Sequence, residues 1–170
     1  WGVTTVDKKH IVTKWSKDLI KLREVAITPQ IKVGDFGFES VQKIVLVKAL
    51  KEGIVVINGD QPLLIRNNGL IDKYNKLPSD FGPNRVLHYQ DRIGLLGPKE
   101  SDRSIHFGEI NDLNDADAFS SINFIKIHQS DNSKLSPGSQ ENTASSNSAS
   151  WDGESITFYE GGNSYKYELR

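Results

Sequence analysis

The chain has 170 residues, a net charge of −1 and no cysteine. Its length suits one folding unit with its own core, so residues 1–170 are expected to form a single domain. The absence of cysteine excludes a disulfide framework, a thiol nucleophile and any cysteine-ligated zinc or iron–sulfur site. The small net charge predicts no nucleic-acid partner and no membrane contact. No run approaches the roughly 18 apolar residues that a membrane span needs.

The charge is unevenly distributed along the chain. Residues 1–79 carry 13 Lys and Arg against 8 Asp and Glu, whereas residues 80–170 carry 8 against 14. The two halves can attract each other within the fold or between copies, although scattered solvated charge would give the same totals. The chain begins at Trp1 and contains no methionine, so we expect a processed product or an excised piece of an extracellular or cell-surface protein.

Residues 7–25 are predicted to form an amphipathic helix. Asp7 suits the N-cap, because its carboxylate can accept hydrogen bonds from the amides of the first turn. Large apolar residues then recur at helical spacing, namely Ile11, Trp15, Leu19 and Leu22. We expect this stripe to pack on a sheet, while the alternative is a basic helix that binds a membrane or an acidic partner.

The next two segments are less regular. Proline and glycine residues punctuate residues 27–38, which are predicted to be a loop or a short edge strand. Residues 40–52 fit two structures. The β-branched run at 44–47 favours a strand, whereas Ser40 as a cap and Gly53 as a terminator favour a second short helix, which is our prediction.

Residues 54–74 give the strongest local signal in the chain. Three short apolar runs are separated by Asn58-Gly59 and by Asn67-Asn68-Gly69. Tight hairpin turns need positive φ, which Asn and Gly adopt at low cost. The sequence therefore predicts an antiparallel meander here.

Strands are also predicted at residues 86–95, 104–110 and 122–128, and a closing hairpin at 156–169. Residues 129–150 are rich in Ser and Asn and are predicted to form a long exposed loop that proteases cut first. The expected fold class is α+β, with the N-terminal helix, and the second at 40–52, packed on a mainly antiparallel sheet built from hairpins. This order of helix, meander and late loop resembles the architecture of the globular part of a type IV pilin or pseudopilin.

Three histidines fall on predicted strands, namely His88, His106 and His128. On adjacent strands in matching register they would form a metal site of hydrolytic type. Each has a carboxylate three residues later, namely Asp91, Glu109 and Asp131. An odd offset along a strand places the two side chains on opposite faces, so these carboxylates cannot orient the rings. We therefore predict no catalytic residue, no cofactor and no metal, with a metal-dependent hydrolase as the alternative.

Two further groups are weaker candidates for binding. Asp112, Asp115 and Asp117 supply oxygen ligands of the kind that calcium prefers, but the glycine and the final glutamate of an EF-hand loop are missing. Exposed aromatic side chains could stack on sugars, as in a carbohydrate-binding module; they are Trp151, Tyr159, Tyr165 and Tyr167. A solvated acidic loop and cross-strand aromatic pairing are the simpler interpretations.

No stretch carries a catalytic or nucleotide-binding signature. The sequence therefore favours a non-enzymatic structural or protein-interaction domain of an exported, cell-surface or assembly-forming protein. Its expected partner is another protein or a second copy of the chain.

Overall fold

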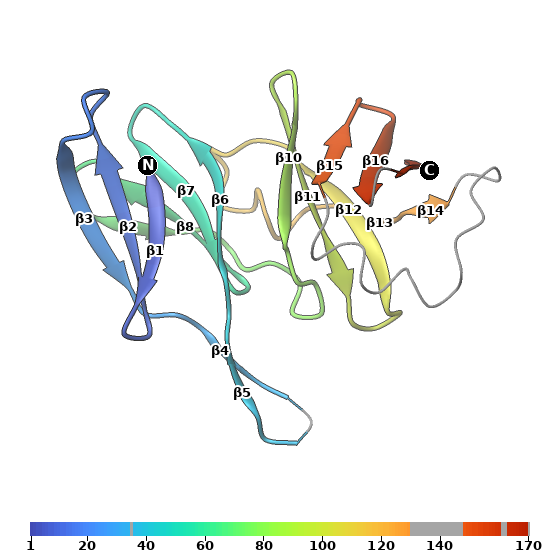
Figure 1. Cartoon of the computed structure of the whole chain (residues 1–170), viewed down its shortest axis with the longest axis horizontal. Helices are drawn as coiled ribbons and strands as arrows, with labels where there is room; N and C mark the ends of the chain where they lie inside the picture. Colours follow the sequence, from blue (N-terminus) through green and yellow to red (C-terminus); the bar gives the residue numbers. More distant parts are fainter. Residues whose placement is uncertain (35, 130–147, 161–162, 170) are drawn as a thin grey trace. The chain divides into compact units, whose positions relative to one another are not determined.

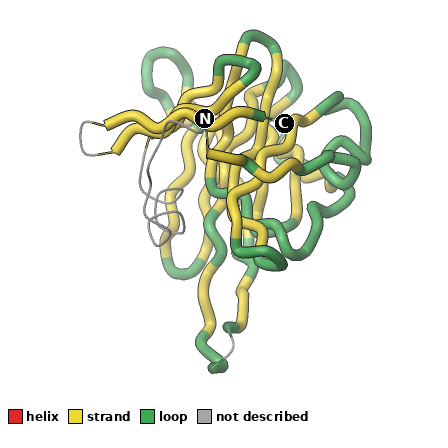
Figure 2. Tube along the Cα trace, turned by 90° about the vertical axis from the view of Figure 1, so that its right-hand side faces the viewer, coloured by secondary structure: helices red, strands yellow, loops and turns green. Residues whose placement is uncertain are grey.

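A computed structural model describes residues 1–34, 36–129, 148–160 and 163–169. The described part is built from β-strands and turns, and it contains no helix (Figures 1 and 2). The predicted α+β class is therefore wrong. The resemblance to a pilin falls with it, because that architecture depends on a leading helix. The chain divides into two compact units, Trp1–Leu77 and Pro78–Arg170, and each is described by itself.

The first unit contains two antiparallel sheets that share one core. One sheet has the order β1-β2-β3, formed by Gly2–Val6, Lys9–Trp15 and Lys21–Ile27. The other has the order β6-β7-β8-β9, formed by Ile44–Ala49, Gly53–Asn58, Gln61–Arg66 and Ile71–Lys73. The core draws on both, through Val12, Ile27, Ile54, Val56, Leu63 and Ile65. This unit is a small β-sandwich, because inner-face side chains of two sheets exclude water together.

The helix predicted at residues 7–25 is replaced by the β1–β2–β3 meander. Asp7 and Lys8 form its first turn, with φ values of 47° and 59°. Successive residues then alternate across the strand, so His10 and Val12 are buried while Lys9 is exposed. The proposed apolar stripe does not pack on a sheet: Trp15, Leu19 and Leu22 are exposed at the end of the β2–β3 hairpin. Their helical spacing was coincidental.

The helix predicted at residues 40–52 is also wrong, and the strand alternative for 44–47 is confirmed within β6. Gly53 starts strand β7 rather than ending a helix. A Cβ at this position would lie 2.1 Å from the backbone oxygen of Ile65 on the neighbouring strand, so only glycine fits. The meander predicted at residues 54–74 is confirmed by the β7–β8–β9 pairing, with Gly59 and Gly69 at positive φ in its turns.

The second unit also contains two antiparallel sheets around one core. One has the order β10-β11-β12-β13, formed by Arg85–Tyr89, Arg92–Lys99, Ser104–Ile110 and Ile125–Lys126. The other has the order β14-β17-β16-β15, formed by His128–Gln129, Asn163–Glu168, Ser155–Glu160 and Ser148–Trp151. Side chains of both sheets build the core, among them Leu96, Phe107, Trp151, Ile156 and Phe158.

The strand predicted at 104–110 and the closing hairpin are confirmed as β12 and the β16–β17 pair. The strand predicted at 86–95 is a hairpin, because Gln90, at a φ of 53°, turns the chain between β10 and β11. The prediction of a long exposed loop at 129–150 falls mostly on residues 130–147, which lie outside the described residues. At its end, β15 pairs with β16 instead of remaining a loop.

A separate two-stranded hairpin extends from the first unit. Its strands are β4 (Ile31–Val33) and β5 (Glu39–Val41), paired so that Ile31 faces Val41. It runs away from both sheets of that unit and carries no residue of the shared core (Figures 1 and 2). We call residues 31–41 the arm.

Candidate interaction site

The arm exposes large apolar side chains along its whole length. Phe36 is 89% and Phe38 78% exposed, and Ile31, Val33 and Val41 are also open to water. Single exposed hydrophobic residues are ordinary, but five of them on one short hairpin are not, and they make the arm a candidate interaction site. An isolated two-stranded hairpin is itself of marginal stability. A second surface that covers the arm would therefore stabilise the hairpin and remove its apolar side chains from water.

Two backbone hydrogen bonds are described near the tip of the arm. The amide of Gly34 donates to the carbonyl of Phe38 at 2.9 Å, and the amide of Gly37 donates to the carbonyl of Gly34 at 2.9 Å. Gly37 has a φ of 75°, which a residue with a side chain rarely adopts. The two phenylalanines are therefore presented by a turn that glycine makes possible.

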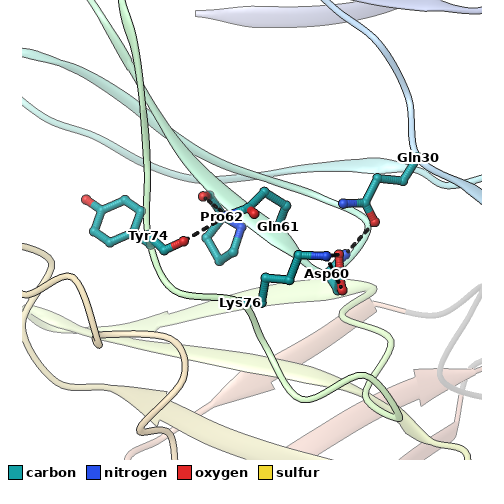
Figure 3. A network of polar contacts seen from close by, with 6 residues as sticks. All are labelled: Gln30, Asp60, Gln61, Pro62, Tyr74 and Lys76. Carbon is teal, nitrogen blue, oxygen red and sulfur yellow. Dashed lines mark hydrogen bonds and ion pairs between the residues drawn. The ribbon is translucent and has the colours of Figure 1, made fainter.

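Buried polar side chains hold the N-terminal end of the arm. Asn58, 5% exposed in the β7–β8 turn, accepts from the amide of Gln30 at 3.3 Å and donates to the carbonyl of Thr28 at 2.9 Å. The side chain of Gln30 in turn accepts from the amide of Asp60 at 3.3 Å. Figure 3 shows Gln30 reaching Asp60, whose carboxylate also pairs with Lys76 at 3.1 Å.

The same turn is held to the residue that follows β9, the last strand of its sheet. Gln61 donates its side-chain amide to the carbonyl of Tyr74 at 2.8 Å and to that of Pro62 at 3.0 Å (Figure 3). The β7–β8 turn, which contacts Gln30, is therefore also fixed by hydrogen bonds to the segment after β9.

A buried histidine holds the C-terminal end. Nε2 of His10 lies 2.9 Å from the carbonyl oxygen of Gln42, and Nδ1 lies 2.9 Å from Oγ1 of Thr5. Because a carbonyl only accepts, Nε2 carries the proton, and in the neutral ring Nδ1 accepts from Thr5. The amide of Gln42 also donates to the carbonyl of Gln30 at 2.8 Å, which joins the two ends of the arm.

Comparisons with family models, with curated proteins and with solved structures find no match to this chain. No helix in the described part of the chain could cross a membrane.

The structure does not bring the three candidate histidines together. His88 pairs with Ile93, whereas His106 pairs with Gly97 on the same strand, four residues further along. At about 3.3 Å per residue this separates the two positions by roughly 13 Å along β11. His128 belongs to β14, in the other sheet of the unit. No group of three metal-ligating side chains occurs among the described residues.

His106 has polar partners that sequence reasoning missed. Its Nε2 lies 2.9 Å from Oδ2 of Asp102 and 3.1 Å from Oγ of Ser104, and that hydroxyl donates to Oδ1 of Asp102 at 2.5 Å. The hydrogen bond from the hydroxyl of Ser104 and, to a smaller extent, the one from His106 hold the pKa of Asp102 well below its usual range. The Asp-x-Ser-x-His pattern is the signal that would have pointed to this cluster.

This cluster lacks the geometry of a catalytic triad. A triad histidine uses one ring nitrogen for the serine and the other for the aspartate. Here Nε2 faces both, and the hydroxyl of Ser104 points its proton at the carboxylate. Nδ1 of His106 is buried and has no hydrogen-bond partner among the described residues. The arrangement closes the β11–β12 turn rather than activating a nucleophile.

The calcium candidates are engaged in their own turns. Asp112 accepts from the backbone and side chain of Asn114 at 2.9 Å each, and Asp115 accepts from the amide of Asp117 at 2.9 Å. The carboxylate of Asp117 accepts from Ser120 at 2.9 Å. These oxygens cap successive turns and do not converge on one point.

The sugar-stacking candidates do not form one open platform. Trp151 is 6% exposed, with the ring of Phe107 at 4.8 Å and the guanidinium of Arg92 at 4.8 Å. Tyr167 is buried against Phe158, with ring centroids 5.2 Å apart, and Tyr165 packs on the same core. Tyr159 alone of the three tyrosines is largely exposed.

Proposed function

We propose that this chain is a non-enzymatic structural or protein-interaction domain that holds its partner through the arm. The observation that carries the proposal is the exposure of Phe36 and Phe38 on a hairpin whose two ends are fixed. A fixed apolar projection loses little conformational freedom when it binds, so more of its burial appears as affinity. Aromatic side chains are also the residues on which binding energy concentrates.

The two polar anchors support the same function. His10 and Asn58 are buried. His10 bonds the carbonyl of Gln42 after the arm and the hydroxyl of Thr5. Asn58 bonds the backbone of Thr28 and Gln30 before the arm. Buried polar groups that are fully paired specify one geometry.

The test is site-specific photo-crosslinking in the cells that make the protein, at the extracellular or cell-surface location that accompanies the proposal. A photoreactive phenylalanine analogue replaces Phe38, and in a matched control it replaces Leu70, an exposed apolar residue between β8 and β9. The expected result is a protein adduct from position 38 that is at least tenfold stronger than that from position 70. Equal labelling from the two positions would overturn the proposal.

A further inference from the structure

A pocket of about 540 Å³ lies at the base of the arm, widely open to solvent, and is called the cavity below. Val3 and Thr5 of β1 line one side, Ile44 and Leu46 of β6 line another, and Val41 of the arm and the buried His10 complete it. Its volume lies within the range of about 300–1,000 Å³ that is typical of ligand pockets. The cavity therefore has room for aromatic side chains.

The cavity lies between two strands that each end a sheet. β1 is the outer strand of the order β1-β2-β3, and β6 is the outer strand of β6-β7-β8-β9. Edge strands offer backbone groups to an incoming chain, and extended segments bind by pairing with them. The arm is itself a pair of extended strands with apolar side chains.

From these observations we infer that the cavity takes the arm of a second copy of this chain. The inference deepens the proposed function and rests on it. Phe36 and Phe38 are largely exposed in their own chain, and the lining of the cavity combines four apolar residues with polar ones beside the two outer strands. Glu39 is exposed on the arm and Lys43 lines the cavity, so an arm that enters from a second copy can bring these opposite charges together.

The position of the cavity selects a closed dimer. Val41 belongs both to the arm and to the cavity wall, so the projecting group and its receptor are neighbours in each copy. Two copies related by a two-fold axis then insert their arms reciprocally, and every contact is made twice. Such an interface is satisfied by two chains, whereas separated patches would continue into a filament.

The absence of cysteine gives a clean background for disulfide trapping. Phe38→Cys protein is mixed with Leu46→Cys protein and oxidised, and the expected product is a mixed dimer of twice 19.0 kDa. The comparison mixtures combine Phe38→Cys with Leu70→Cys or with Ile20→Cys, both at exposed apolar positions away from the cavity lining. These should yield less than one tenth of the mixed dimer.

Analytical sedimentation of the unmodified chain is the second experiment. We expect a dimer that the double variant Phe36→Ser/Phe38→Ser weakens at least tenfold, whereas Leu70→Ser leaves it unchanged. Leu46→Arg should weaken it as well, by filling the cavity, and circular dichroism checks that each variant keeps its strands. A chain that stays monomeric up to about 1 mM, a concentration at which even weak pairs associate, overturns the inference.

The two proposals fail in different ways. Two trapping results would overturn the cavity as the docking place and leave the proposed function standing. One is equal disulfide formation with cysteines at positions 46, 70 and 20. The other is no disulfide at position 46 although the dimer still depends on Phe36 and Phe38. A monomeric chain whose position 38 still labels another protein in cells does the same. Photo-crosslinking from position 38 that is no stronger than from position 70 overturns both the proposed function and the docking in the cavity.

Discussion

The side chain of Gln30 lies directly over Gly59. A Cβ at Gly59 would meet Oε1 of Gln30 at 2.4 Å and its Cβ at 3.0 Å. The glycine thus has two roles: it takes a φ of 63° in the β7–β8 turn, and it leaves room for the residue that begins the arm.

Gly59→Ala should therefore lower the free energy of unfolding by more than the strain of the turn alone. A left-handed conformation costs a residue with a side chain roughly 1–2 kcal/mol. Displacing Gln30 also removes its hydrogen bond to the amide of Asp60, which adds about 1 kcal/mol. The control is Gly69→Ala, which has a φ of 91° but meets only the flexible end of Arg23. Urea unfolding that shows equal losses for the two variants would contradict this account.

His10→Ala should loosen the arm at its C-terminal end. The substitution removes the donor to the partly buried carbonyl of Gln42, at a cost of about 1 kcal/mol. The amide of Gln42, which donates to Gln30, should then exchange with solvent at least tenfold faster in hydrogen-exchange measurements. Thr5→Val removes only the hydroxyl that contacts Nδ1, so it should leave this exchange rate close to that of the unmodified chain. Unchanged exchange in His10→Ala would show that the histidine does not hold the arm.

Gly94→Ala should be among the most damaging single substitutions in the second unit. A Cβ at Gly94 would lie 2.1 Å from the ring of Phe107, which is part of the buried core. Overpacking of this kind costs about 3 kcal/mol. Gly82→Ala is the matched control, because its nearest neighbour is 3.8 Å away, and it should change the unfolding free energy by less than about 0.5 kcal/mol. A Gly94 variant as stable as the Gly82 variant would mean that Phe107 has room to move.

Two aspartates should make stability fall in acid. The hydroxyl of Ser155, with the amides of Glu154 and Ser155, holds the pKa of Asp152 well below its usual range, and Ser104 and His106 do the same for Asp102. A depressed folded-state pKa contributes stability that is complete above the unfolded pKa of about 3.9 and is lost as the pH falls below it.

Unfolding by urea between pH 7 and pH 2.5 measures this contribution. Asp152→Asn should flatten the loss of stability below pH 4, because the titrating group has been removed. Asp91→Asn removes an exposed carboxylate that accepts no hydrogen bond described in the structure, and it should leave the acid slope unchanged. An Asp152→Asn variant with the full acid slope would assign that slope to other carboxylates.

Local turn chemistry explains which parts of the fold could be predicted. The Asn58-Gly59 and Asn68-Gly69 steps each place a glycine at positive φ within a turn, so turn chemistry alone predicts the meander of residues 54–74. The β1–β2 turn is made by Asp7 and Lys8 at positive φ, which no sequence rule favours for lysine, and Asp7 was mistaken for a helix cap. Short apolar runs at chance helical spacing then completed the error, because periodicity over two turns cannot separate the two structures.

The arm was only partly foreseeable. Glycines near Phe36 and Phe38 correctly indicated a break or an edge strand, but exposure depends on what the rest of the chain covers, and this is a tertiary property. The alternation of Ile31 and Val33 resembles that of a buried strand. The anchors were hidden for the same reason: His10 lies 32 positions from Gln42, and Asn58 lies 28 from Gln30.

The contact between Gln30 and Gln42 brings both ends of residues 31–41 to one place. The chain leaves and re-enters the sandwich at adjacent points. Residues 31–41 can therefore be lengthened, shortened or exchanged without moving β3 or β6. None of their side chains belongs to the core of the first unit. The core of the first unit and the arm are therefore built from separate stretches of the chain, and changes within residues 31–41 leave the packing of the sandwich core intact.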